Sequence, residues 1–197
     1  ESDRVLAAKL GVGRSAIREA LKVLDVLGMI DIRPGQGTYI SNDETNFFII
    51  PLSWSLFLNG KQVENILTVR NLLEVKAAEL AAECTDTDAL KNLKAVDEKM
   101  NCAYAQQDYK AFLETDLEFH QGIARCSQNT VILSMMQTIS SLMRHVSGSG
   151  MVNAQQLKES EEEHSRIYDC IMRHDGKGAA EAMQYHLGRA AGRYNYR

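Results

Sequence analysis

The chain has 197 residues, which is enough for one large or two small domains. Hydrophobic residues make up 45% and charged residues 24%, as in ordinary globular proteins, and no run of about 18 apolar residues exists, so we expect no membrane span and no membrane partner. The net charge is −4, yet residues 1–41 hold six Lys and Arg against five Asp and Glu. A slightly basic head on an acidic body indicates a modular protein. It argues against a protein whose whole surface is basic and binds nucleic acid.

The four cysteines follow no C-x-x-C spacing. They are Cys84, Cys102, Cys126 and Cys170. Each falls within an apolar helical pattern, which favours small core hydrophobes in a reducing compartment over a disulfide framework or a zinc–thiolate site. We therefore expect a cytoplasmic protein.

The N-terminal head has the pattern of a winged helix-turn-helix. Residues 2–10 predict a short helix, residues 11–13 (Gly-Val-Gly) a tight turn, and residues 14–27 a second helix. Two short alternating segments flank residues 34–37 (Pro-Gly-Gln-Gly) and predict a hairpin. A hairpin directly after a helix-turn-helix is a wing.

The outer face of the second predicted helix indicates what the head binds. Arg14, Ser15 and Arg18 lie at its N-terminal end, away from the apolar stripe that contains Ile17 and Leu21. A helix end that offers arginines and a hydroxyl can enter the major groove of DNA, where arginine reaches guanine edges or phosphates. The alternative is a solvated charged face on an ordinary small domain, but the turn and the wing in sequence favour DNA binding.

A connecting segment separates the head, residues 1–41, from a body, residues 62–197. Residues 42–61 begin with a polar stretch and continue with an apolar one. The apolar stretch would invite aggregation if it stood free in solvent, so we predict a short helix after Pro51 that docks on the body or on another subunit.

The body shows nearly continuous helical periodicity. Short connections between its apolar stripes predict antiparallel neighbours, so we expect a mainly α fold with an all-helical bundle. The predicted helices are residues 63–83, 87–106 and 109–126, a fourth helix capped by Asn129, and residues 153–174 and 177–193.

One carboxylate and three imidazoles lie on inward faces of the predicted helices. His120 follows Asp116 by four residues, about one helical turn, while His164 and His186 share the apolar stripes of two later helices. An ionised aspartate on an apolar face is costly unless it is paired or bound to a cation. These four groups suit Zn²⁺, Ni²⁺ or Mn²⁺. The alternative is a hydrogen-bonded Asp–His pair, which is the commoner explanation of an isolated D-x-x-x-H.

Both parts of the chain resemble known bacterial regulators. The GntR family of transcription regulators has a head similar to residues 2–21 (SDRVLAAKLGVGRSAIREAL), Gly28 and residues 35–38 (GQGT). The FCD effector domain of its FadR subfamily resembles the chain from about Val69 to the end, at residues 69–74 (VRNLLE), 116–120 (DLEFH), 163–167 (EHSRI) and 186–187 (HL).

For the head, the resemblance implies a double-stranded DNA operator, commonly palindromic, bound by a homodimer. It also implies one further helix upstream, which this sequence lacks. Gly13 stands where the family commonly has a polar residue, so we expect no side-chain contact there. The implied DNA-contacting residues are Arg4, Arg14, Ser15, Arg18, Gly35 and Gly37.

For the body, the resemblance implies that Asp116, His120 and the two later histidines are metal ligands, with Zn²⁺ ranked before Ni²⁺ and Mn²⁺. It also implies a small carboxylate effector such as a sugar acid or hydroxyacid. Arg70 is our first candidate for the arginine that binds this carboxylate, and Arg144 is the second. The alternative for Arg70 is a structural ion pair with Glu74 at i,i+4.

We therefore expect a transcription regulator in which a metal-bound effector alters operator binding, with repression relieved by the effector as the commoner sense. Two alternatives stay open. One is a metalloenzyme with a metal-bound water as nucleophile, although Glu118 points to another helix face and no H-E-x-x-H motif occurs. The other is a regulator whose metal is purely structural.

Overall fold

The computed structural model describes residues 2–41, 63–146 and 154–193, with the backbone alone for residues 63, 142–146 and 191–193. The chain divides into two compact units, Glu1–Gly60 and Lys61–Arg197. The predicted connecting segment and its docking helix lie outside the described residues.

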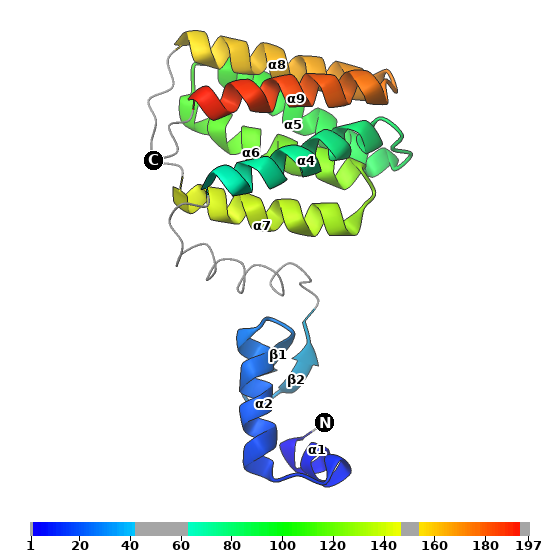
Figure 1. The fold of residues 1–197 in the computed structure, drawn as a ribbon, viewed down its shortest axis with the longest axis vertical. Helices are drawn as coiled ribbons and strands as arrows, with labels where there is room; N and C mark the ends of the chain where they lie inside the picture. Colours follow the sequence, from blue (N-terminus) through cyan, green and yellow to red (C-terminus); the bar gives the residue numbers. More distant parts are fainter. Residues whose placement is uncertain (1, 42–62, 147–153, 194–197) are drawn as a thin grey trace. The chain divides into compact units, whose positions relative to one another are not determined.

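The N-terminal unit contains a helix-turn-helix followed by a two-stranded wing (Figure 1). Its elements are α1 (Asp3–Leu10), α2 (Arg14–Val26), β1 (Ile30–Arg33) and β2 (Gly37–Ile40). The strands pair antiparallel, and Arg33 lies opposite Gly37 at the tip. Gly35 and Gly37 have φ angles of 75° and 121°, which side chains disfavour, so the wing tip requires glycine there. The predicted winged helix-turn-helix is thereby confirmed.

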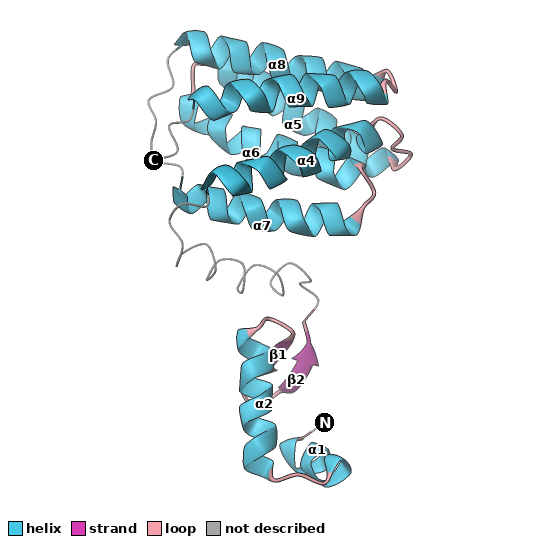
Figure 2. Ribbon diagram, viewed as in Figure 1, coloured by secondary structure: helices cyan, strands magenta, loops and turns pink. Residues whose placement is uncertain are grey.

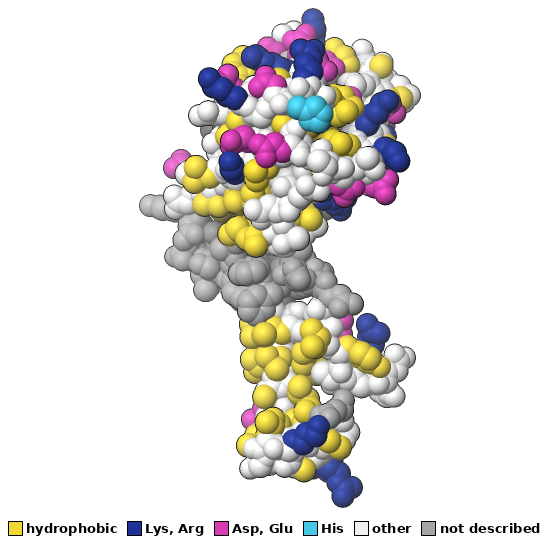
Figure 3. Space-filling model, turned by 90° about the vertical axis from the view of Figure 1, so that its right-hand side faces the viewer, with side chains coloured by type: hydrophobic (Ala, Val, Ile, Leu, Met, Phe, Trp, Pro, Cys, Tyr) yellow, Lys and Arg dark blue, Asp and Glu magenta, His cyan; other side chains and the backbone are white. Residues whose placement is uncertain are grey.

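The head buries few of its side chains. Among its described residues, Ala7 and Ile17 are the buried hydrophobic ones, whereas Ile40 is 83% exposed. Figure 3 shows hydrophobic side chains spread over one face of this unit. The wing is fastened to α2 by a hydrogen bond of 3.1 Å from the Ile32 amide to Asp25 Oδ1. Since a fully buried large side chain contributes only about 1.5–3 kcal/mol, this core gives the head modest stability.

The C-terminal unit is built from helices throughout its described residues (Figure 2). They are α4 (Val63–Ala81), α5 (Thr87–Ala105), α6 (Tyr109–Cys126), α7 (Thr130–Val146), α8 (Ala154–Met172) and α9 (Gly176–Arg193). Their ends differ from the predicted ones by at most two residues, and both ends of α6 are as predicted. The predicted all-helical bundle is confirmed.

Short polar side chains cap the first turns of several of these helices, among them α5, α6 and α7. Asp86 accepts hydrogen bonds from backbone N–H groups in the first turn of α5, and Asp108 does the same for α6. Asn129 Oδ1 accepts from the amides of Val131 and Ile132, each at 3.1 Å, so the predicted cap of α7 is confirmed. Such caps satisfy N–H groups that have no partner within the helix.

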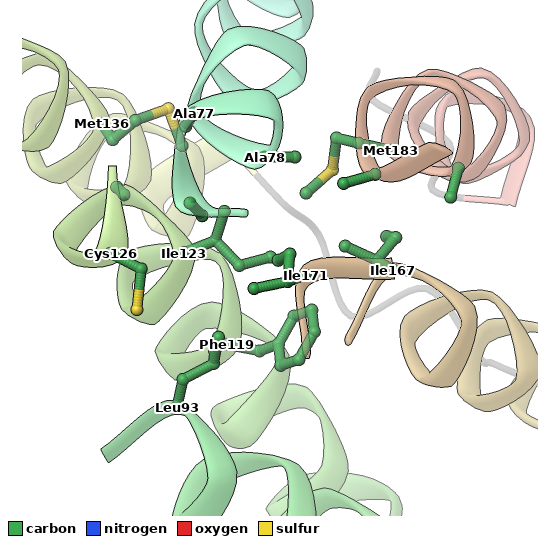
Figure 4. Close-up of a cluster of buried hydrophobic side chains, with 14 of the residues drawn as sticks. Ala77, Ala78, Leu93, Phe119, Ile123, Cys126, Met136, Ile167, Ile171 and Met183 are labelled. Carbon is green, nitrogen blue, oxygen red and sulfur yellow. The ribbon is translucent and has the colours of Figure 1, made fainter. Parts of the chain in front are cut away.

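The core lies where the inward faces of the body helices meet. α4 packs chiefly against α9, α8 against α9, and α5 against α6. Figure 4 shows Phe119 and Ile123 of α6 next to Ile167 and Ile171 of α8, with Met183 of α9 nearby. Because α6, α8 and α9 all contribute to this core, polar groups on their inward faces are brought together.

The cysteines are free and only partly follow the prediction. Cys84 and Cys126 are buried, as expected for core hydrophobes, although Cys84 lies in the turn after α4. The expectation is wrong for Cys102, which is exposed on α5 and accepts a hydrogen bond from Gln106. Among the described helices, none has the length and apolar character that a membrane crossing needs.

Candidate metal centre and nucleic-acid interface

Asp116, His120, His164 and His186 converge inside the body. One ligand atom from each residue lies within 4.8 Å of the others. α6 supplies Asp116 and His120 one turn apart, α8 supplies His164, and α9 supplies His186. The three imidazoles are buried, whereas the Asp116 side chain keeps 14% of its surface exposed. The structure therefore brings together the four side chains that the sequence pattern singled out.

Two of the imidazoles are held through Nδ1 by buried carboxylates. Glu163 Oε2 accepts the Nδ1 proton of His186 at 3.0 Å. Glu74 Oε2 lies in ion-pair contact with His120 Nδ1. A neutral imidazole that donates from Nδ1 carries its lone pair on Nε2, which is the atom available to a metal.

The third imidazole uses a backbone acceptor. His164 Nδ1 donates to the Ser160 carbonyl oxygen at 2.6 Å, and His164 Nε2 lies 3.1 Å from Asp116 Oδ1. Two acceptors therefore face each other. The Nε2 atoms of His164 and His120 are buried without a hydrogen-bond partner. Because buried polar atoms are rarely left unpaired, these nitrogens fit a cation that lies between them and the carboxylate.

The donor set and its dimensions fit a transition-metal ion. Two ligands at about 2.1 Å from one ion lie at most about 4.2 Å apart, so the spread of 4.8 Å has to close by about 0.6 Å or more when an ion binds. Three nitrogens and one carboxylate oxygen suit Zn²⁺, Ni²⁺ or Mn²⁺.

Burial and neighbouring charges shift the pKa values of Glu74, Asp116 and His186 in directions that favour cation binding. Burial raises the pKa of Glu74, but Arg70 and His120 outweigh burial and lower that pKa to about 2. Burial also raises the pKa of Asp116, but the adjacent imidazoles, His164 foremost, outweigh burial and lower that pKa well below its usual range. Burial lowers the pKa of His186 to about 4. At neutral pH these carboxylates are therefore ionised and His186 is neutral, which is the state in which they bind metal.

An arginine stands behind each of the two glutamates. Arg70 Nε lies 2.5 Å from Glu74 Oε1, so the ion pair weighed as an alternative role for Arg70 is present. Arg189 Nε lies 3.1 Å from Glu163 Oε1, and the same guanidinium contacts Glu159.

The two candidate effector-binding arginines differ in what the structure describes. Arg70 lines a pocket of about 330 Å³ between α4 and α9, together with Asn71 and Leu187. Leu187 directly follows the candidate ligand His186 in sequence, and Arg70, which lines the same pocket, pairs with Glu74 next to His120. The side chain of Arg144 lies outside the described residues.

The predicted DNA-contacting residues all lie on the surface of the head. Arg14 opens α2 directly after the N-cap Gly13, and no acidic residue occupies the first turn of the helix. The positive end of the helix dipole and the arginines therefore attract phosphate together. The exposed residues are Arg4, Arg14, Ser15 and Arg18 on the helices and Gly35 and Gly37 on the wing.

Sequence reasoning missed the groups that hold the imidazoles. The burial of Glu74 could have been predicted from the sequence, because it is an acidic residue on the apolar stripe of α4, four positions after Arg70. No such pattern indicated Glu163, since its partner His186 is 23 positions away. The Ser160 carbonyl is a backbone group that no side-chain pattern reveals.

Comparison with known proteins assigns both units. The model of the FCD domain matches residues 65–189, and the model of the bacterial regulatory proteins of the gntR family matches residues 2–40. The chain belongs to the GntR family. This family membership makes the protein a bacterial transcription regulator with a DNA-binding helix-turn-helix and an FCD domain.

Named relatives of this GntR protein are also regulators. It is 33% identical to the HTH-type transcriptional regulator LutR of Bacillus subtilis over 195 residues, covering 95% of this chain and 87% of LutR. It is 28% identical over 193 residues to the Glc operon transcriptional activator of Escherichia coli K12, covering 94% and 76%. Among solved structures, Streptococcus agalactiae GntR superposes with a TM-score of 0.75 at 30% identity, covering 97% of this chain and 88% of that one.

The comparisons also decide between regulator and enzyme. The relatives carry the names of transcription regulators, including the galactonate operon transcriptional repressor of E. coli K12 at 26% identity over 182 residues, 90% of this chain and 79% of that protein. Glu118, the acidic residue weighed as a general base, is exposed and pairs with Lys99 at 3.5 Å. This GntR protein is therefore a regulator and not a metalloenzyme.

Proposed function

We propose that this regulator binds one divalent metal ion, Zn²⁺ before Ni²⁺ or Mn²⁺, through Asp116, His120, His164 and His186. The observation that carries the proposal is the convergence of four ligand atoms within 4.8 Å, with the three Nδ1 atoms engaged elsewhere. The metal's role is to offer a Lewis-acidic position to an oxygen ligand.

The effector in this proposal is a small carboxylate such as a sugar acid or a hydroxyacid. One relative is named for the galactonate operon, and galactonate is a sugar acid. A carboxylate oxygen on the ion and a second one on a guanidinium would fix such a molecule in orientation. Arg70 is the leading candidate because it lines the pocket next to Leu187, and Arg144 is the second candidate. Arg70 can hold two carboxylates at once, as Arg189 does with Glu159 and Glu163.

In this proposal, binding of the effector changes the affinity of the regulator for its operator. A homodimer would place two heads on the two halves of a palindromic operator. An effector that binds one arrangement of the bundle more tightly than another shifts the population toward it. Coupling of this kind typically changes affinity about 5- to 150-fold.

The test combines metal content with operator binding. Native mass spectrometry of the full chain should detect one metal ion per subunit. Fluorescence anisotropy, on an operator selected from a random duplex pool, should then show that at least one sugar acid or hydroxyacid changes the dissociation constant by about 5-fold or more. The His164→Ala variant should lose both the metal and the response. A stoichiometric metal without any effect of the acids would instead favour a purely structural metal.

A further inference from the structure

We infer that Glu163 and Glu74 are positioning residues of the metal centre, each held by an arginine and each fixing one ligand imidazole. The inference rests on the metal site of the proposed function. It concerns side chains that do not touch the ion, and it adds two arginine–glutamate–histidine chains to the four ligands.

The first chain runs from the surface of α9 inward. Arg189 Nε lies 3.1 Å from Glu163 Oε1, and Glu163 Oε2 accepts from His186 Nδ1 at 3.0 Å. The two oxygens of one buried carboxylate therefore have different partners, so the position of Glu163 is set from both sides. Arg189 is 42% exposed and also contacts Glu159, which restricts the guanidinium further.

The second chain repeats this order on other helices. Arg70 Nε lies 2.5 Å from Glu74 Oε1, and Glu74 Oε2 contacts His120 Nδ1. The carboxylate is almost fully buried, with 2% of its side chain exposed. α4 and α6 provide this chain, whereas α8 and α9 provide the first. The same arginine–glutamate–histidine order thus occurs twice, on two different pairs of helices. This repetition supports a common role for the two glutamates.

The arginines explain how two glutamates can stay buried beside a centre that already holds Asp116. A buried carboxylate is costly unless it is paired with a charge and hydrogen-bonded. Each arginine supplies the charge, His186 Nδ1 supplies a hydrogen bond to Glu163, and His120 Nδ1 lies in ion-pair contact with Glu74. The carboxylate in turn selects the tautomer whose Nε2 faces the centre, and loss of such a partner typically weakens metal binding 10- to 100-fold.

Glu163 is the better residue to test, because Glu74 lies deeper in the core. In Glu163→Leu the acceptor is lost, and Co²⁺ should bind about 10- to 100-fold more weakly, with an altered visible absorption band. In Glu163→Gln an amide oxygen can still accept from Nδ1, so binding should return to within a few-fold of the wild type. Glu162→Leu is the matched control, since the Glu162 side chain is 61% exposed and pairs with Lys158 at 3.7 Å, and this variant should bind Co²⁺ as the wild type does.

A second measurement needs no metal. The ¹⁵N chemical shifts of the His186 ring in the metal-free full chain should show a proton on Nδ1 in the wild type and loss of that preference in Glu163→Leu. Circular dichroism would confirm that each variant is folded. The inference is overturned if Glu163→Leu binds Co²⁺ as tightly as the wild type, if Glu163→Gln is as weak as Glu163→Leu, or if His186 carries its proton on Nε2. A wild type that binds no Co²⁺ would sink the proposed function instead.

Discussion

Glu163 and His186 lie on neighbouring helices, and the carboxylate of the first accepts the Nδ1 proton of the second at 3.0 Å. This bond leaves His186 Nε2 to face Asp116 and the other two imidazoles. Protein groups therefore set the ring orientation and the tautomer of the ligand imidazole, and the metal ion is not needed for either. Metal binding then requires only small movements of side chains that already converge.

Metal should stabilise the folded protein, and the ligands should be required for this. Zn²⁺ at about 100 times its dissociation constant is expected to raise the free energy of unfolding by about 2.7 kcal/mol, because the folded state binds it and the unfolded state does not. Urea titrations with Zn²⁺ and with EDTA measure the difference, which His164→Ala should abolish. His174→Ala is a suitable control, because His174 contacts the Ala82 carbonyl at 2.7 Å, away from the centre. An equal zinc effect in His164→Ala would contradict the proposed ligand set.

Acid should weaken the metal-free body. The pKa of His186 is lowered from 6.5 to about 4, chiefly by burial, and that of Glu74 is lowered from 4.5 to about 2, where Arg70 and His120 outweigh burial. Both folded-state pKa values are depressed, so the unfolded chain binds more protons. Stability is therefore lost as pH falls from 6.5 to 4 for His186 and from 4.5 to 2 for Glu74, by up to about 3 kcal/mol per group.

Urea midpoints measured in EDTA between pH 7 and pH 4.5 provide the test of this prediction. The His186→Gln variant should flatten the part of the curve above pH 4.5. A midpoint that is constant or rises as the pH falls through this range would show that the imidazole is not held in its neutral form.

Part of this site was predictable from the sequence for a physical reason. In a helix the apolar stripe defines the inward face, so Asp116, His120, His164 and His186 could be assigned to the core from periodicity. Glu163 follows two acidic residues, and nothing local distinguishes a buried carboxylate from solvated ones. Its role depends on α8 packing against α9, which is a property of the tertiary structure.

Arg70 should prove essential to stability through Glu74. In Arg70→Met the Glu74 carboxylate remains buried without its guanidinium, which is expected to cost about 3–5 kcal/mol. The double variant Arg70→Met/Glu74→Gln removes the uncompensated charge and should regain most of this loss. Urea unfolding of the two single variants, the double variant and the wild type forms a double-mutant cycle. Additive effects would mean that the two residues do not depend on each other.

The arginines of α2 should account for much of the operator affinity. If Arg18 contacts a base, Arg18→Ala is expected to weaken the free energy of operator binding by about 1–3 kcal/mol. It should also relax the base preference at one position. If Arg18 contacts a phosphate, binding should weaken uniformly across sequences. The slope of the logarithm of the binding constant against the logarithm of the salt concentration should then become shallower by about one. Lys110→Ala on the body is the control, because its side chain is 89% exposed. Equal affinity of Arg18→Ala and wild type for all duplexes would exclude this helix face from the interface.

Two helical glycines should respond in opposite ways to the same substitution. A Cβ at Gly122 would lie 3.0 Å from Leu93 Cδ1, where α5 and α6 pack closely, whereas a Cβ at Gly188 would meet nothing within 4 Å. Gly122→Ala should therefore destabilise the body by about 1–3 kcal/mol through overpacking. Gly188→Ala should stabilise it by about 0.5–1 kcal/mol, because alanine is the better helix former. Thermal unfolding of both variants tests the pair, and stabilisation by Gly122→Ala would show that α5 and α6 are not packed as closely as described.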